Sequence, residues 1–153
     1  PQRRRSRFTK PSTSATRLKS TKIGMAKVKM ASRTENTCVT CHLGEDSAHT
    51  FAPTVAACTG CHADAEDFDI NGLQTEVGEK LDTLLGYLVE NGLMAIEEGE
   101  PHPVPQTGVF PAEQTQAAWN YILLSYEDHS HGIHNPAYTR ALLDWSISVF
   151  EGE

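Results

Sequence analysis

The fold is decided by residues 73–89, which read LQTEVGEKLDTLLGYLV. Apolar side chains recur in this stretch at intervals of three and four, at Leu73, Val77, Leu81, Leu84, Leu85, Leu88 and Val89. That spacing places them on one face of an α-helix, as packing against a core requires. Asn91-Gly92 follows as a stop signal, because glycine readily adopts the left-handed conformation that closes many helices. The pattern predicts a helix that begins at Leu73 and ends near Asn91.

Two further helices are predicted on the C-terminal side of this segment. Between the first and second helices, proline excludes regular helix because it lacks a backbone donor and fixes φ; the four prolines there are Pro101, Pro103, Pro105 and Pro111. Pro111 fits the first turn of a helix running to about Glu127. Asn135-Pro136 then resembles an N-cap followed by proline at the first helical position, which opens a third helix through Val149.

The sequence therefore predicts an all-α protein with about three helices joined by long irregular loops. No strand-like alternation is long enough to build a sheet. Residues 34–70 are rich in small and polar residues, and short helical turns are the regular structure expected there. Residues 1–33 keep neither helical nor strand periodicity, so we expect an extended N-terminal arm.

Charge divides the chain in the same way. Residues 1–33 hold 11 of the 13 Lys and Arg residues and no acidic residue. Residues 34–153 carry the other two basic residues and all 20 acidic residues, which gives them a net charge of −18. A basic arm, residues 1–33, is therefore joined to an acidic domain, residues 34–153. Asymmetry of this size concerns partners more than fold. No apolar run reaches the length of a membrane span, so none is expected.

Two pentapeptides of the form Cys-x-x-Cys-His carry the chemistry, at residues 38–42 and 58–62. In this spacing two thiols can add to the two vinyl groups of one haem while the adjacent imidazole reaches the iron. The sequence thus predicts two covalently attached haem c groups. Cys38, Cys41, Cys58 and Cys61 are the predicted attachment residues, and His42 and His62 are the predicted proximal ligands. The whole chain is only 39 % hydrophobic, and two porphyrins would add apolar surface to its core.

Zinc and disulfide bonds are the alternatives for these cysteines. The two Cys-x-x-Cys pairs fall within the spacing of a four-cysteine zinc ribbon. However, with 7 His among 153 residues, a histidine directly after both pairs arises by chance about once in five hundred sequences. Neither zinc nor a disulfide in each pair explains those histidines, which favours haem.

Each iron needs a sixth ligand or keeps an open face. More histidines lie outside the motifs than two irons need as sixth ligands. Two bis-histidine haems are therefore expected, with lower potentials than His/Met haems. His49 is the first candidate because it lies between the motifs, and His134 is the second because it stands just before a helix start. The alternatives are His102, His129 and His131. Met94 is expected to pack in a helix core, while Met25 and Met30 belong to the arm.

Residues 127–143, EDHSHGIHNPAYTRALL, add a family resemblance. They resemble the C-terminal signature of multihaem cytochromes c related to nitrite reductase and hydroxylamine oxidoreductase, in which a Gly-x-His-Asn-Pro-x-Tyr element precedes a long helix. Residues 36–69 resemble the last haem-binding pair of such proteins. The resemblance implies that His134 and His49 are the distal ligands. The chain lacks every upstream haem motif of the family, including the motif that would hold the open catalytic haem. The resemblance therefore implies that this chain corresponds to the part of such proteins that relays electrons.

The expected function is electron transfer by a dihaem c-type cytochrome that is not an enzyme. Its partners would be redox proteins, with self-association or a larger complex through the basic arm, and no nucleic acid is expected. The family chemistry implies a periplasmic or extracellular location. The alternatives are a small haem enzyme with one open iron, a zinc-ribbon binding module, and an arm that grips an anionic polymer or membrane surface.

Overall fold

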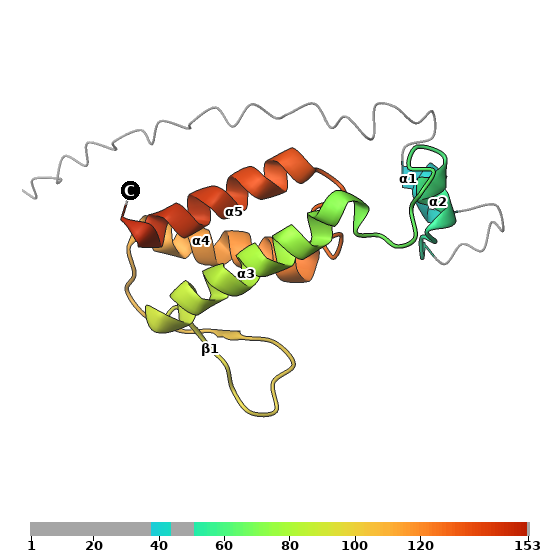
Figure 1. Ribbon diagram of the computed structural model, residues 1–153. Coiled ribbons are helices and arrows are strands. Elements are labelled where there is room, and N and C mark those ends of the chain that lie inside the picture. Colours follow the sequence, from blue (N-terminus) through green and yellow to red (C-terminus); the bar gives the residue numbers. More distant parts are fainter. Residues whose placement is uncertain (1–37, 44–50, 153) are drawn as a thin grey trace, which may run out of the picture.

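A computed structural model describes residues 38–43 and 51–152 (Figure 1). Of these residues 57 % are helical and 4 % lie in strands, so the mostly helical class is confirmed. The predicted basic arm, residues 1–33, and the candidate ligand His49 lie outside the described residues.

The described chain runs through two short helices, a three-helix body and one small hairpin. The short helices are α1 (Cys38–His42) and α2 (Ala56–Thr59). A 3-10 turn, η1 (Ile70–Gly72), leads into α3 (Leu73–Glu90). The hairpin strands are β1 (Met94–Ala95) and β2 (Val104–Pro105). The remaining elements are α4 (Ala112–Ile122), the π-helix η2 (Leu123–Glu127) and α5 (Pro136–Glu151).

Helix α3 confirms the prediction made from its apolar spacing. It begins at Leu73, and Asn91 caps its C-terminal end by donating its backbone N–H to Tyr87 O. Gly92 follows with φ of 72°, the left-handed conformation that glycine allows. Five of the seven spaced apolar residues are buried, at Leu73, Val77, Leu81, Leu84 and Leu88.

The second helix differs from its prediction at both ends. Pro111 precedes α4 as the N-cap, with ψ of 142°, rather than lying in the first turn. The α-helix ends at Ile122, and the chain continues as a π-helix whose wider turn is closed by Asp128 N–H donating to Leu123 O at 2.8 Å. The third prediction is confirmed: Asn135 caps α5, its side chain accepting from Tyr138 N–H at 3.4 Å, and Pro136 opens the helix.

A two-stranded antiparallel sheet occupies the proline-rich connection, where no sheet was predicted. Met94 pairs with Pro105 and Ala95 with Val104. Gln106 N–H extends the pairing by donating to Leu93 O at 2.8 Å. Strands of two residues are too short to show alternation, so the sequence pattern could not reveal them.

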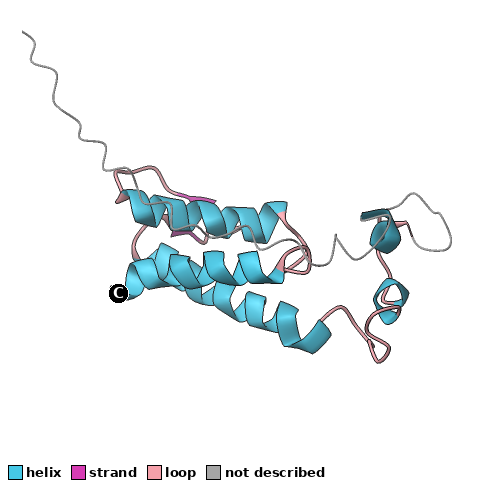
Figure 2. Ribbon diagram, turned by 90° about the horizontal axis from the view of Figure 1, so that it is seen from above, coloured by secondary structure: helices cyan, strands magenta, loops and turns pink. Residues whose placement is uncertain are grey.

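One hydrophobic core joins the three long helices. Helix α5 packs against both α3 and α4, and all three lie side by side (Figures 1 and 2). The core residues that these helices and the hairpin contribute, besides those of α3 given above, are Leu93, Met94, Ala117, Tyr121, Leu124, Leu142 and Leu143. Helices α1 and α2 lie beyond the end of this body where α3 begins and η2 ends, so the Cys-x-x-Cys-His motifs stand at one end of the bundle.

Candidate functional site

Each Cys-x-x-Cys-His motif forms a helical turn. Residues 38–42 are helix α1 itself. In the second motif the turn is closed by Cys61 N–H and His62 N–H, which donate to Cys58 O at 3.1 and 2.8 Å. Residues three apart in a helical turn share a face, so the two thiols of each motif can reach one planar group. The local structure has the form that thioether attachment of a haem requires.

The two motifs lie against each other. Helices α1 and α2 are in contact, and the pKa of the Cys58 thiol is raised by burial and, to a smaller extent, by the nearby Cys41 thiol. All four cysteines are free thiols in the structure. Within residues 38–43 and 51–152, no three His, Cys, Asp or Glu side chains converge as ligands for a metal ion. Helices α1 and α2 nevertheless bring the two cysteine pairs of the zinc-ribbon alternative next to each other.

The imidazole of His42 is fixed by a backbone carbonyl. Its Nδ1 atom lies 2.7 Å from Phe51 O. A carbonyl oxygen only accepts, so Nδ1 carries the proton and Nε2 presents a lone pair, which is the tautomer that a metal-ligating histidine needs. The Phe51 ring lies 6.2 Å from the imidazole, centroid to centroid, and is 62 % exposed. A flat apolar group bound at His42 would cover this aromatic surface.

The imidazole of His134 is fixed in the same way by a carboxylate. Its Nδ1 atom lies 2.8 Å from Asp128 Oδ1. An ionised carboxylate accepts and does not donate, so this Nδ1 also carries a proton and Nε2 is left for a ligand. The His134 side chain is 62 % exposed, whereas that of Asp128 is 24 % exposed.

The imidazole rings of His42 and His134 lie near each other. Their ring centroids are 6.1 Å apart, and the ring planes are inclined by 43°. Imidazole nitrogens bind metal ions at about 2 Å, so two imidazoles on opposite sides of one ion have centroids about 6 Å apart. The spacing and the protonated Nδ1 atoms both match a bis-histidine site. Of the two preferred distal candidates, His134 is the one that the described residues bring to a proximal histidine.

The loop that presents His134 is held at several points. The π-helix ends at Asp128, whose carboxylate also accepts from Ser130 N–H at 3.2 Å. Ser130 Oγ accepts from His134 N–H at 3.3 Å, and Ser130 O accepts from the Gln74 side chain on α3. Gly132, with φ of 90°, is buried where a Cβ would meet two side chains of the helix body. These contacts fix the path of the backbone from Asp128 to His134.

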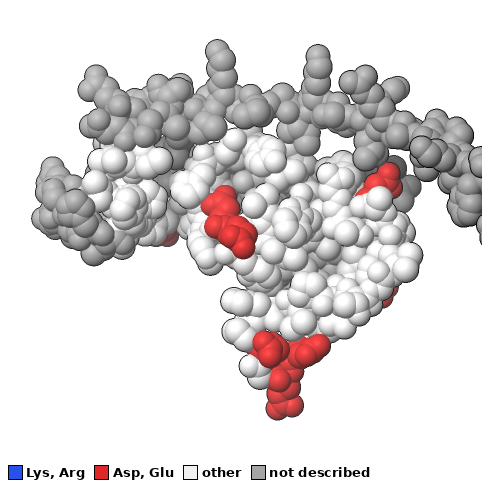
Figure 3. Space-filling view, turned by 180° about the vertical axis from the view of Figure 1, so that it is seen from behind, with Lys and Arg blue, Asp and Glu red and all other residues white. Residues whose placement is uncertain are grey.

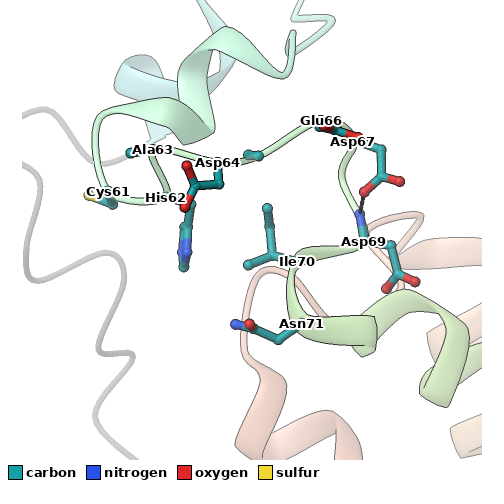
Figure 4. Close-up of a pocket in the computed structure, with 10 residues that line it drawn as sticks. Cys61, His62, Ala63, Asp64, Glu66, Asp67, Asp69, Ile70 and Asn71 are labelled. Atoms are coloured by element: carbon teal, nitrogen blue, oxygen red, sulfur yellow. Dashed lines mark hydrogen bonds between the residues drawn. The ribbon is translucent and has the colours of Figure 1, made fainter.

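The second motif borders an open hollow of about 520 Å³ (Figure 4). The His62 ring points into it beside Asp64 and opposite Ile70. Acidic side chains line the hollow, and one of them, Asp69, is held in place by two hydrogen bonds. Its Oδ1 accepts from Gln74 N–H, and its Oδ2 accepts from Thr75 Oγ at 2.6 Å. The hydroxyl of Thr75 is the main reason that the pKa of Asp69 is lowered. The His62 ring is exposed in this hollow.

The other sequence candidates occupy different positions. His129 and His131 are exposed in the loop that carries His134. His102 packs on the Tyr126 ring at a centroid distance of 4.7 Å. Met94 is 2 % exposed in the core, as its predicted packing role requires, but it lies in strand β1 and not in a helix. His49 falls outside the described residues, as do Met25 and Met30.

Sequence reasoning missed the two groups that orient the imidazoles. The Phe51 carbonyl carries no side-chain signal and could not have been found. Asp128 did carry one, because Asp followed two residues later by Ser often forms a turn in which the carboxylate accepts the Ser backbone N–H.

A comparison of the chain with protein-family models, curated proteins and solved structures finds no match in any of the three. The functional argument therefore rests on the motifs and on the geometry of the described residues.

Proposed function

We propose that this protein is an electron-transfer cytochrome with two covalently attached haem c groups. Cys38, Cys41 and His42 would hold the first haem, with His134 as its distal ligand. Cys58, Cys61 and His62 would hold the second, for which His49 is the expected distal ligand. The observation that carries the proposal is the closeness of His42 and His134, whose centroid separation of 6.1 Å suits one metal ion between them.

The surroundings of both histidines support the same function. Phe51 O and the Asp128 carboxylate each occupy an Nδ1 atom, so both rings offer Nε2. Helices α1 and α2 are in contact, which would keep the two redox groups close enough to exchange electrons. When bound, the haem iron supplies the one-electron chemistry, and the chain supplies ligands, burial and orientation. No acid, base or nucleophile is needed, so the protein is proposed as a carrier rather than an enzyme.

The proposed location is periplasmic or extracellular, because covalent c-type haem is normally assembled outside the cytoplasm. None of the helices within residues 38–43 and 51–152 is long and apolar enough to cross a membrane.

The test of this function is a haem count on the protein as isolated. A pyridine-haemochrome spectrum and an intact mass should give two covalent haems per chain, and replacing Cys58 and Cys61 by alanine should reduce the count to one. EPR of the oxidised protein should show low-spin iron. One high-spin iron would support the haem-enzyme alternative, and a chain that holds zinc but no haem would overturn the proposal.

The charge pattern supports a second proposal, that the basic arm of one subunit binds the acidic domain of another. Both basic residues of the domain are engaged in ion pairs: Lys80 with Glu76 and Asp144, and Arg140 with Glu76. Within residues 38–43 and 51–152, no other acidic side chain forms an ion pair with Lys or Arg. Some acidic residues gather at the hairpin tip, where Glu97, Glu98 and Glu100 are exposed (Figure 3). A filament or larger complex would follow if the contact runs head to tail.

Light scattering at low and high salt tests the assembly. The full chain should associate at low salt and dissociate at high salt, because exposed charges are screened. Deletion of residues 1–33 should abolish the association without changing the haem count. A monomer at low salt would contradict the assembly, and salt-sensitive binding of that monomer to anionic vesicles would assign the arm to a membrane surface instead.

A further inference from the structure

We propose that Asp128 is a positioning residue that lowers the reduction potential of the haem bound by His134. This inference rests on the proposed function, because it requires His134 to be an iron ligand. It adds a role for a residue that neither the Cys-x-x-Cys-His motifs nor the family resemblance assigns.

The contact between Asp128 and His134 is short, and the Asp128 side chain in it is partly buried. Its Oδ1 atom lies 2.8 Å from His134 Nδ1, within the range of a charge-assisted hydrogen bond. The same oxygen accepts from Ser130 N–H, so the carboxylate is tied into the loop that carries the imidazole. The side chain of Asp128 is 24 % exposed, which limits competition from water.

The π-helix η2 explains how Asp128 reaches this position. Its last turn is closed by Asp128 N–H and Leu123 O, five residues apart, instead of the four of an α-helix. One additional residue in the turn rotates the chain by roughly 100° relative to a continued α-helix. Such π turns recur at functional sites. Here the turn places Asp128 beside His134, the residue before the N-cap of α5.

The hydrogen-bond acceptor of each imidazole gives the direction in which Asp128 shifts the reduction potential. His42 donates to a neutral carbonyl, Phe51 O, while His134 donates to a carboxylate. A carboxylate accepting from Nδ1–H raises the basicity of the ligating nitrogen. A more basic ligand stabilises the ferric state over the ferrous state, and the negative charge acts in the same direction. The potential of this haem is therefore lowered by Asp128.

The experiment is a dye-mediated redox titration of the dihaem protein, comparing Asp128→Asn with the native chain. Loss of an outer hydrogen-bond partner typically costs a metal site 10- to 100-fold in metal affinity or activity. At the lower end, the ferric-to-ferrous ratio at fixed potential should fall about tenfold, which is about 59 mV upward for a one-electron couple. The other haem should keep its potential. Asp82→Asn, which removes an equal charge from the exposed face of α3, should shift neither haem.

A His134→Met background separates this inference from the proposed function. Methionine has no N–H for Asp128 to accept, so in this background Asp128→Asn should shift the potential less, by the contribution of its charge alone, as a double-mutant cycle can measure. The inference is overturned if Asp128→Asn leaves the potential unchanged, or shifts it equally in the methionine background. If His134→Met instead leaves the haem spectrum unaltered, His134 is not a ligand and the proposed coordination fails.

Discussion

Replacing Gly132 by alanine should loosen the loop that presents His134, and its cost can be worked out from two contacts. Gly132 has φ of 90°, and a Cβ there would lie 3.2 Å from Val77 Cγ2 and 3.3 Å from Thr139 Cγ2. Val77 and Thr139 are 0 % and 2 % exposed, so neither can turn into solvent. The left-handed conformation costs alanine roughly 1–2 kcal/mol, and the crowding adds about 1 kcal/mol. We expect Gly132→Ala to lower the free energy of unfolding by about 2–3 kcal/mol.

Gly99 provides a matched control, because its φ is also 90° but a Cβ there would meet nothing within 4 Å. Gly99→Ala should therefore show only the backbone cost, roughly 1–2 kcal/mol. Urea unfolding of both variants measures the difference, and the m-value should stay constant if only stability changes. Equal losses in the two variants would refute the packing argument for Gly132. An unchanged Gly132→Ala protein would refute the conformational argument as well.

Two further predictions concern groups in the helix body. The hydrogen bonds of Arg140, and then those of Lys80, lower the pKa of Glu76 from 4.5 to about 2. The stabilisation from ionised Glu76 is therefore present above about pH 4.5 and is lost as the pH falls towards 2. Glu76→Gln should make the free energy of unfolding less dependent on pH in that window. Urea unfolding midpoints of both proteins at about pH 5 and about pH 3 would show this. Ser146→Ala should cost about 1–3 kcal/mol in the same assay, because the buried Asn120 amide, which donates to Ser146 Oγ at 3.0 Å, would lose its acceptor. A loss below about 0.5 kcal/mol would contradict that assignment.

The helices that the sequence predicts well are those whose signals are local. The apolar spacing of α3 lies within one segment, and Asn135-Pro136 combines a side-chain cap with a fixed φ. The π-helix was missed because residues 123–127 contain no residue that breaks an α-helix. The contacts beside this change in register are those of the Tyr126 ring with Tyr121, five residues earlier, and with His102.

In the candidate site, too, the features that the sequence predicts are local ones. Each Cys-x-x-Cys-His motif is readable because its reactive atoms are neighbours in sequence. The approach of His134 to His42 depends on how α5 packs on the body, which no local pattern specifies. Five histidines outside the motifs were therefore open as distal ligands, and geometry was needed to bring one of them to His42.

Spectroscopy of His134→Ala tests the central claim most directly, with His131→Ala as a control from the same exposed loop. Electronic absorption and EPR spectra of the oxidised proteins would be compared with those of the native chain at equal haem content. The account predicts that His134→Ala converts one of two low-spin haems to high spin, or to a form that binds added imidazole, while His131→Ala keeps both low-spin. Two unchanged low-spin haems in His134→Ala would contradict it.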